Sequence, residues 1–477
     1  MKRFRLLSAA AICFAVPATL PAQTTRSISA SDRAQGSQAN PELVAQFGGR
    51  YDGSQAAFVE RVGKRVSLQS GLSNASGDFT VQLLNSPVEN AFAIPGGYVY
   101  VTRQLLALMN SEDELAFVMG HEVGHVAARH SAGRQRTSTI GGVLAGIVGA
   151  VAGNSNFGSL LGRGAQQAAG LYALKYGRDQ EYQADTLGVR YVAGAGYNPY
   201  GAPLILNQLG AETALEARVA GRDASATPTW LSTHPSSADR VARARALAQQ
   251  AGRGGPATGQ DVAFLRMLDG MRYDDDPAQG VIDGQTFRHP QMRIRFTAPA
   301  GYTIANASDA VTVAGQRGQA QLTMGSGDPA AALTARFRTL GGQVSADQVR
   351  DVTINGRRAA TATITATANN SRVDATVVAI AFPTGTYVWT VATPAGSGVG
   401  ALAPVIDSFT TLSASEAAAI KGRRIRIATV RAGDTIDSLA RQMDYPNFQR
   451  ERFLTLNGLD ANAALRPGML VKLVVTG

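Results

Sequence analysis

The feature that most constrains this chain is a His-Glu-Val-Gly-His run that begins at His121. On an α-helix, residues i and i+4 lie one above the other, so His121 and His125 face the same side and can bind one Zn²⁺ ion. Glu122 then lies beside the metal, where it can take a proton from water. Ser111 and Glu114 form a capping box ahead of an apolar helical run. The pattern therefore predicts a buried helix that carries a zinc site.

The third metal ligand is sought among the acidic residues that follow. A metzincin would need histidine at position 131, where this chain has Ser131, and no Asp or Glu occurs between Glu122 and Asp179. The next acidic pair, Glu181 and Asp185, is again spaced i and i+4 and faces one way. We predict that Glu181 completes the site for one Zn²⁺ per chain and that Asp185 accepts a hydrogen bond from a ligand histidine.

The remaining histidines have less certain roles. His130 would be turned roughly 140° from His125 on a continuous helix, so we interpret it as a surface or packing residue. His234 precedes a proline in a loop and could either stabilise an oxyanion or occupy the open metal position and keep the site latent. Arg240 could orient His234 or the carboxylates. His289 stands alone in the middle of the chain and is interpreted as structural.

A short β-prone segment precedes the predicted zinc helix. Pro95 and the two following glycines predict a tight turn into a strand. Such a strand can offer an open edge that pairs with an extended peptide over the metal. The candidate substrate-binding residues are therefore Gly97, Tyr98, Val99 and Tyr100, and an ordinary hairpin is the alternative.

Taken together, these motifs match one family. The HExxH run, the ExxxD run from Glu181, the strand-and-turn segment 90–102 and a Ser-Thr-His-Pro run before Arg240 follow in order within residues 42–247. The sequence resembles the HtpX-like gluzincin endopeptidases of metallopeptidase family forty-eight, most closely their exported bacterial branch. The resemblance implies a mainly α-helical zincin-type domain with a short edge-strand sheet. It also implies a zinc endopeptidase that cleaves exported or outer-membrane proteins, including misfolded ones.

The C-terminal segment matches a second family. Its expected order is strand, helix, helix, strand, with residues 433–435 capping the first helix and Pro467 turning into the last strand. This segment resembles a LysM domain, a module that binds N-acetylglucosamine-containing glycans such as peptidoglycan. The resemblance implies a cell-wall partner, and a small packing or protein-docking module is the alternative.

The length of 477 residues predicts about three domains. Between about residues 350 and 391, period-two alternation predicts an antiparallel meander, and helical patches on either side make this an α+β domain. The predicted divisions are a signal peptide (1–22), a flexible lead-in (23–41), a zinc metalloprotease domain (42–248), a linker (249–260), an α+β accessory domain (261–415), a basic linker (416–426) and a βααβ LysM-like domain (427–477).

The N-terminal pattern and the charge bear on location and partners. A basic start followed by an apolar stretch and small residues is typical of a secretory signal peptide, which predicts a periplasmic or secreted protein associated with the cell wall or outer membrane. The formal net charge is +10, but the arginines are scattered, which argues against a nucleic-acid partner. The apolar segment 140–153 is too short to span a bilayer, so it is interpreted as a buried helix or flap, or as a membrane-surface contact.

The leading hypothesis is therefore a zinc endopeptidase of the bacterial envelope that acts on polypeptide substrates. In a second hypothesis the chain is a cell-wall-binding assembly factor whose protease domain is latent or chaperone-like. A peptidoglycan amidase is a third, less favoured because a strand edge suits a peptide backbone.

Overall fold

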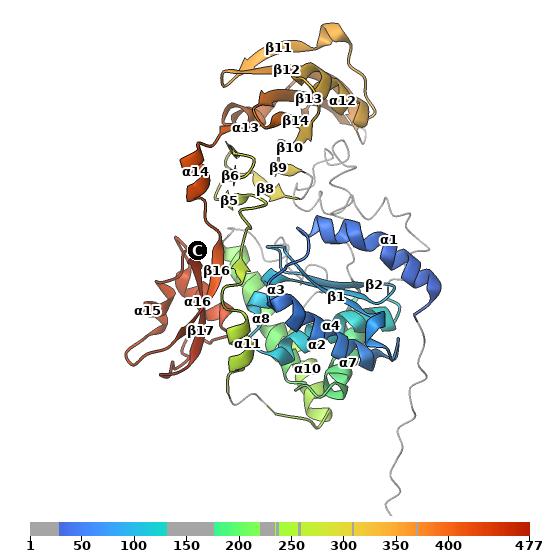
Figure 1. Cartoon of the computed structure of the whole chain (residues 1–477), viewed down its shortest axis with the longest axis vertical. Helices are drawn as coiled ribbons and strands as arrows, with labels where there is room; N and C mark the ends of the chain where they lie inside the picture. The colour runs from blue at the N-terminus through green and yellow to red at the C-terminus, as the bar shows by residue number, and fades with distance from the viewer. Residues whose placement is uncertain are drawn as a thin grey trace, which may run out of the picture.

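The computed structural model describes residues 28–130, 176–219, 234, 238–255, 259–307, 310–368 and 371–477. These residues form two bodies, which lie one above the other in Figure 1. The lower body combines the N-terminal part of the chain with residues 423–477, and the upper body is the middle domain. The predictions of a multidomain chain, a helical domain and an antiparallel-sheet domain are confirmed. The predicted signal peptide and the segment 140–153 lie outside the described residues.

The N-terminal part of the lower body packs helices around one short sheet. Its helices are α1 (Ala30–Gln46), α2 (Gln55–Ser67), α3 (Arg103–Leu108), α4 (Glu112–Ala127), α7 (Arg178–Gly194), α8 (Gly201–Val219), α10 (Ala238–Gln250) and α11 (Val262–Met267). Its strands are β1 (Thr80–Leu84), β2 (Ala91–Ile94) and β3 (Tyr98–Thr102), and two 3-10 turns, η1 (Leu68–Ser70) and η2 (Ser76–Asp78), lie between α2 and β1.

The sheet corrects the prediction of an edge strand. Its order is β1-β3-β2, so β3 is central and pairs with β1 in parallel and with β2 antiparallel. The prediction that Gly97, Tyr98, Val99 and Tyr100 offer an open edge to a peptide is wrong, because both sides of β3 are already hydrogen-bonded. The hairpin turn reveals the pairing of β2 with β3, but it does not reveal that the earlier strand β1 adds to the other side. The outer strands of this sheet are β1 and β2.

Helix α1 corrects a second prediction. Most of the segment 23–41, expected to be a flexible lead-in, is helical from Ala30 onward. Leu43, with Phe47 just beyond the helix, packs on the sheet residue Phe92, and the Phe47 and Phe92 ring centroids are 4.9 Å apart. α1 therefore covers the face of the sheet opposite α2 and α4 (Figure 1). The sequence of α1 does not predict a helix because it is mostly polar, and its buried apolar residues lie only near its C-terminal end.

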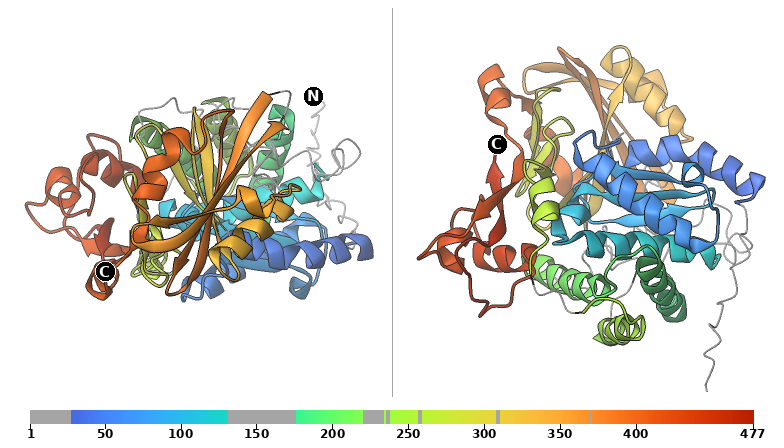
Figure 2. Two further views of the ribbon diagram at one scale, coloured as in Figure 1. Left: turned by 90° about the horizontal axis from the view of Figure 1, so that it is seen from above. Right: turned by 60° about the horizontal axis from the view of Figure 1, so that its bottom comes forward.

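The C-terminal segment has the predicted order of strand, helix, helix and strand. Its elements are β16 (Arg423–Thr429), α15 (Ile436–Ala440), α16 (Gln449–Leu456) and β17 (Leu470–Thr476). β4 (Arg272–Tyr273) adds a third strand beside β16. Ile425, Phe453 and Leu473 belong to the same hydrophobic core as Leu106 and Phe117 of the N-terminal part. The two parts therefore share one core, and the right-hand view of Figure 2 shows the C-terminal residues beside the N-terminal part.

Two boundaries differ from the predicted ones. α11, expected in the accessory domain, contacts β17, and Phe264 lies in the shared core of the lower body. Arg423, expected in the basic linker, lies in β16. Both segments lie next to the points where the chain leaves the lower body and returns to it. Composition marks linkers, but it does not show which body a short flanking element joins.

The middle domain packs two sheets against each other. Its strands are β5 (Val281–Asp283), β6 (Thr286–His289), β7 (Ile294–Thr297), β8 (Thr303–Asn306), β9 (Val311–Gly315), β10 (Gly318–Gly325), β11 (Arg350–Ile354), β12 (Arg357–Ala368), β13 (Ser371–Phe382), β14 (Gly385–Pro394) and β15 (Thr410–Thr411). Its helices are α12 (Pro329–Thr339), α13 (Ala403–Asp407) and α14 (Ala414–Ala419), with the 3-10 turns η4 (Ala346–Gln348) and η5 (Gly400–Leu402).

The predicted meander is the centre of the larger sheet, whose order is β11-β12-β13-β14-β10-β9-β8. The smaller sheet, in the order β15-β7-β6-β5, covers one face, and α12 covers the other. Period-two alternation explains this arrangement. On β13, Val378 and Ile380 enter the core between the sheets, while Val377 and Ala379 pack in the core that contains α12 residues.

The middle domain is an insertion into the lower body. The chain leaves near Pro277 and returns near Gly422, and a Cβ atom added to Gly422 would lie only 2.9 Å from Pro277 Cδ. Just inside the lower body, Asp274 accepts hydrogen bonds from Arg423 at 3.0 Å and from the Tyr445 hydroxyl at 2.6 Å. These contacts hold the two segments that connect the bodies side by side.

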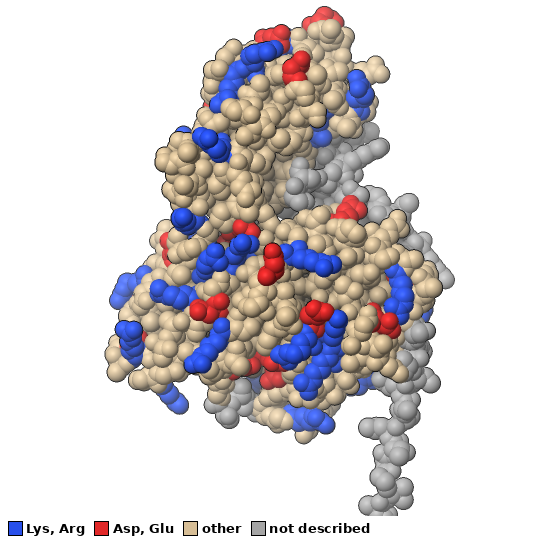
Figure 3. Space-filling view, in the orientation of Figure 1, with Lys and Arg blue, Asp and Glu red and all other residues tan. Residues whose placement is uncertain are grey.

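Charges of both signs are interspersed on the face shown in Figure 3, with no continuous basic groove there. Among the described residues, no helix has both the length and the apolar character needed to cross a membrane.

Candidate metal centre

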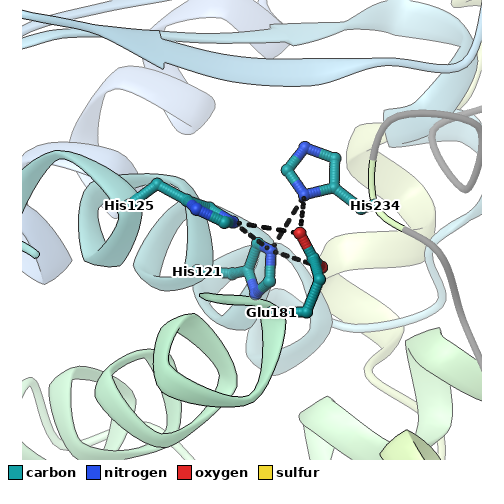
Figure 4. A group of neighbouring side chains, drawn as sticks. All are labelled: His121, His125, Glu181 and His234. Carbon is teal, nitrogen blue, oxygen red and sulfur yellow. Dashed lines mark hydrogen bonds and ion pairs between the residues drawn. The ribbon is translucent and has the colours of Figure 1, made fainter. Parts of the chain in front are cut away.

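Four buried side chains from separate segments converge on one point (Figure 4): His121 and His125 from α4, Glu181 from α7, and His234, which precedes α10. His121 Nε2 lies 3.0 Å from His125 Nε2 and 3.2 Å from His234 Nδ1. Glu181 Oε1 lies 3.1 Å from His234 Nδ1 and 3.5 Å from His125 Nε2. Each residue therefore directs one donor atom toward a common centre.

These donor atoms suit a small tetrahedral cation. The four atoms all lie within 4.8 Å of one another. Tetrahedral zinc with bonds of roughly 2.0–2.1 Å holds its ligand atoms ~3.3–3.4 Å apart. The measured separations of 3.0–3.5 Å fall around that value. Imidazole nitrogen and carboxylate oxygen are also the ligand types that zinc accepts, so this donor set fits Zn²⁺.

The helices α4 and α7 approach each other closely because glycine faces glycine. A Cβ atom at Gly120 would lie 3.1 Å from the carbonyl oxygen of Gly188, and one at Gly188 would lie 3.1 Å from the backbone nitrogen of His121. Both separations are tighter than ordinary van der Waals contact, so larger side chains would force the helices apart. This crossing is what allows Glu181 of α7 to reach the histidines of α4.

Arg240 joins the two carboxylates of α7. Its Nε donates to Asp185 Oδ2 at 2.8 Å and its Nη2 to Asp185 Oδ1 at 2.7 Å. Its Nη1 lies 2.8 Å from Glu181 Oε2 and donates to the carbonyl oxygen of His234 at 3.1 Å. Asp185 Oδ1 in turn lies 2.9 Å from His121 Nδ1. The structure thus places Asp185 behind a histidine and Arg240 against both carboxylates and the His234 backbone.

Glu122 lies on the other side of His234. Its Oε1 is 3.5 Å from His234 Nε2, and both side chains are buried. His234 therefore directs Nδ1 toward the other three donor atoms and Nε2 toward Glu122. The residue that would occupy the fourth metal position thus also contacts the predicted general base.

The charges of the site are set by its hydrogen bonds. Burial opposes the ionisation of Asp185, but hydrogen bonds from Arg240 and His121 outweigh it and lower the Asp185 pKa to about 2. Burial likewise opposes the ionisation of Glu181, and His234, His121 and Arg240 together lower its pKa. Burial and the neighbouring histidines hold the pKa of His125 well below its usual value. The carboxylates are therefore anionic and His125 is neutral, as metal ligands must be.

The sequence interpretation missed two members of this site. His130 is buried and its Nδ1 lies 2.8 Å from His125 Nδ1, so the surface alternative is wrong and it packs against the site instead. Tyr176 stacks on the His125 ring, with centroids 3.7 Å apart and planes at 24°. The sequence carries no signal for Tyr176. His289 lies in β6 of the middle domain, away from this cluster.

The model of peptidase family M48 matches residues 54–248, the span that contains every residue of this cluster. This part of the chain is a peptidase family M48 domain. The predicted resemblance to metallopeptidase family forty-eight is thereby confirmed, and the buried cluster is compatible with a metal site.

The M48 domain has named relatives. Over 227 residues the chain is 30% identical to the beta-barrel assembly-enhancing protease of Yersinia pestis, covering 46% of this chain and 44% of that protein. It is also 30% identical over 200 residues to the Escherichia coli protein of the same name, covering 40% of this chain and 39% of that protein. Over 211 residues it is 28% identical to the mitochondrial metalloendopeptidase OMA1 of Schizosaccharomyces pombe, covering 42% of this chain and 56% of that protein.

The chain thus spans roughly half the length of these relatives, from 39% to 56%.

Proposed function

We propose that this protein is a zinc-dependent endopeptidase of the bacterial cell envelope. The observation that carries the proposal is the cluster of His121, His125 and Glu181 with Glu122 beside it, inside an M48 domain. A zinc ion held there would polarise a peptide carbonyl and make water more acidic. Among the residues that the structure describes, the other two carboxylates at the cluster, Glu181 and Asp185, are both held by Arg240.

The residues of the chain then have distinct tasks. Glu122 takes a proton from the attacking water and delivers it to the leaving amine. Asp185 accepts a hydrogen bond from His121 Nδ1, which leaves His121 Nε2 to face the metal. Arg240 neutralises part of the negative charge of Asp185 and Glu181 and holds both carboxylates in place.

We propose further that the conformation described is latent. His234 Nδ1 has the position of a fourth ligand, which a water molecule and the substrate carbonyl need during hydrolysis. His234 must therefore move away before a peptide can bind. If it is an inhibitory ligand, His234→Ala raises the rate of peptide hydrolysis. A His234→Ala protein with lower kcat and unchanged zinc content would instead support the oxyanion role.

The envelope location, substrates and partners belong to this proposal as well. The basic and apolar start of the chain supports export, and relatives named beta-barrel assembly-enhancing proteases support substrates among envelope proteins. These substrates include misfolded and outer-membrane proteins. The βααβ order of residues 423–477 supports a LysM-like module that binds peptidoglycan. Retention of the purified chain on insoluble peptidoglycan tests that last point, and absence of retention would contradict it.

The enzymatic proposal is tested by zinc content together with hydrolysis of a fluorescently labelled unfolded polypeptide. The purified chain is expected to hold near one zinc ion. Glu122→Gln should keep the zinc and lose about 10²- to 10⁴-fold in kcat, whereas Glu181→Ala should lose the zinc. Glu60→Gln, on the exposed face of α2, is the matched control. A chain without zinc, or a fully active Glu122→Gln protein, would overturn the proposal.

A further inference from the structure

His130 holds an unexpected position at the end of the zinc helix. It is 7% exposed, and its two ring nitrogens both have partners. Nδ1 lies 2.8 Å from Nδ1 of His125, and Nε2 lies 3.0 Å from Oε1 of Gln183 on α7. The ring therefore connects a predicted metal ligand on one helix to an amide on the other.

The backbone at the end of α4 explains how His130 reaches His125. The N–H group of Arg129 donates to the carbonyl of Val126, and the N–H group of His130 donates to the carbonyl of His125, both at 3.0 Å. Arg129 has a positive φ of 55°. These are the features of a Schellman motif, which folds the chain back over the last turn. A continuous helix would have carried residue 130 away from residue 125, and the motif returns it.

The left-handed backbone at Arg129 indicates that this return is built into the fold. Helices commonly place glycine at this position, because a Cβ atom makes the left-handed backbone unfavourable. The Gln180 amide also contacts the carbonyl oxygen of His130, at 3.5 Å. Gln180 and Gln183 both belong to α7, so the helix that supplies Glu181 also holds His130.

Only one arrangement of protons satisfies this chain of contacts when His125 binds a metal through Nε2. His125 must then carry its proton on Nδ1 and donate it to His130 Nδ1. His130 must carry its own proton on Nε2, which donates to the Gln183 carbonyl oxygen, an acceptor only. Each hydrogen bond thus selects the tautomer that the next one needs.

We propose that His130, held by Gln183, is a positioning residue that directs Nε2 of His125 toward the metal. It does for His125 what Asp185 does for His121, but with a neutral acceptor in place of a carboxylate. Tyr176 stacks on the face of the His125 ring and restrains the plane of that ring. The hydrogen bond to His130 restrains the rotation of the ring within this plane. This inference rests on the proposed zinc site.

The test measures zinc affinity by competition with a chromogenic chelator, which requires no activity of the enzyme. His130→Ala should weaken zinc binding about 10- to 100-fold, the usual loss when the partner of a ligand histidine is removed. His130→Asn should restore most of this loss, because its side-chain oxygen can accept the His125 Nδ1 proton. Gln183→Leu should weaken binding less than His130→Ala, and His289→Ala, in the middle domain, is the control.

A histidine NMR readout separates positioning from general stability. The hydrogen-bonded Nδ1 proton of His125 should be present in the natural and His130→Asn proteins and absent in His130→Ala. If His130→Ala destabilises the zinc-free protein but leaves zinc affinity unchanged, the positioning role is wrong. Should His130→Ala not fold, Gln183→Leu decides, and unchanged zinc affinity in that variant overturns the proposal.

Glu181→Ala distinguishes the failure of this inference from the failure of the zinc site. If Glu181→Ala loses zinc while His130→Ala binds it normally, only the positioning role is overturned. If the natural protein and Glu181→Ala bind zinc equally, the proposed site itself is wrong.

Discussion

Two groups of buried charged side chains lie at opposite ends of α4. Near the C-terminal end of this helix, Arg240 and the α7 carboxylates surround the HExxH histidines. At its start, Glu114 lies near Lys472 of β17 and Glu212 of α8, and all three are buried. Both groups are removed from water, yet their carboxyl groups respond in opposite ways.

The pKa values show this difference. Hydrogen bonds from Arg240 and His121 overcome burial and lower the pKa of Asp185 to about 2. At the other end, burial raises the pKa of Glu114 to about 7 and that of Glu212 to about 8. Burial lowers the Lys472 pKa to about 7, with Glu114 and Glu212 acting against it. The site carboxylates are ionised, whereas near neutral pH Glu212 is largely protonated and Glu114 is close to its midpoint.

The partner of each cation explains the contrast. Arg240 donates directly to Asp185 through two bonds of 2.7 and 2.8 Å. Lys472 directs its three N–H bonds to backbone carbonyls at the end of α3, those of Ala107, Leu108 and Met109, at 2.7–3.0 Å. Its neighbouring carboxyl groups receive only its Coulomb field. Glu114 also accepts hydrogen bonds, from the Asn110 backbone N–H group and the Ser111 hydroxyl, but these neutral donors do not overcome its burial. A direct hydrogen bond from a cation therefore makes the difference between the two groups.

The largest expected effect is that of Arg240→Gln. The change leaves Asp185 and Glu181 buried without their cation, and breaking a buried pair in this way costs about 3–5 kcal/mol. Urea unfolding of the zinc-stripped protein measures this loss in the free energy of unfolding. Arg245→Gln, at an exposed position of the same helix, is the control. Equal stability of the two variants would show that the site carboxylates do not depend on Arg240.

A smaller effect is expected for Lys472→Met. The methionine fills the volume but removes the Lys472 hydrogen bonds to three carbonyls, of which that of Leu108 keeps the Gln208 amide as a donor. We expect this loss to cost about 2–3 kcal/mol. The loss is smaller than for Arg240→Gln because the neighbouring carboxyl groups are already partly protonated near neutral pH. Lys421→Met, at an exposed position, is the control.

The same variant tests the shared core. Thermal unfolding of Lys472→Met, followed by tryptophan-independent signals such as circular dichroism, should show the M48 domain and residues 423–477 melting together. A separate early transition of the C-terminal residues, with the M48 domain unchanged, would contradict a common core.

The third prediction concerns pH and Glu212. Its pKa is about 8 in the folded protein, above the ordinary glutamate value, because of burial and then Glu216. The folded state therefore binds more protons than the unfolded state across this interval, and stability falls as pH rises from about 5 to 8. In Glu212→Gln this contribution disappears. The free energy of unfolding of the natural protein should therefore fall relative to Glu212→Gln by at most about 1.4 kcal/mol per pH unit over this range.

Urea titrations at pH 5, 6.5 and 8 on both proteins measure this difference, and metal effects cancel because the proposed metal ligands are the same in both proteins. Lys472 acts in the opposite direction, since its lowered pKa makes stability rise with pH above about 7. A natural protein that gains stability relative to Glu212→Gln between pH 5 and 7 would show that Glu212 is ionised when folded.

Local spacing explains which parts of the site could be predicted from the sequence. His121, His125, Glu181 and Asp185 lie at i and i+4 on two helices, so the helix geometry alone brings each pair to one face. The meander of the middle domain was predictable for a similar reason, because alternation depends on neighbours within one strand.

Contacts between distant segments explain what could not be predicted. Lys472 donates hydrogen bonds to carbonyls at the end of α3 that lie 363 to 365 residues away in the sequence, and no local pattern predicts these contacts. β3 is central only because β1, from an earlier segment, pairs with it. The position of His130 could not be predicted for a different reason. The helix ends at Ala127, so the angles of a continuous helix do not apply to residue 130. No feature of the sequence predicts that the backbone of Arg129 is left-handed.

The smallest expected effect belongs to an exposed ion pair on the same zinc helix. Arg61 of α2 donates to both carboxylate oxygens of Glu112, at 2.8 and 3.2 Å, and the Arg61 side chain is 50% exposed. Water and salt screen such a pair, so Arg61→Gln should cost only about 0.5–1 kcal/mol. The cost should shrink further in 1 M salt, where the screening length is about 3 Å.

Urea unfolding in low and high salt measures this cost, with zinc affinity expected to stay unchanged. The Arg61 pair resembles that of Arg240 with Asp185, since both are two-bond contacts. The two arginines differ in burial and in the further contacts of Arg240 with Glu181 and the His234 carbonyl. If Arg61→Gln cost as much as Arg240→Gln, bond geometry would decide stability at both places. A cost several times smaller, and sensitive to salt, means that an arginine–carboxylate pair matters to this fold only where removing one partner leaves a charge in the protein interior.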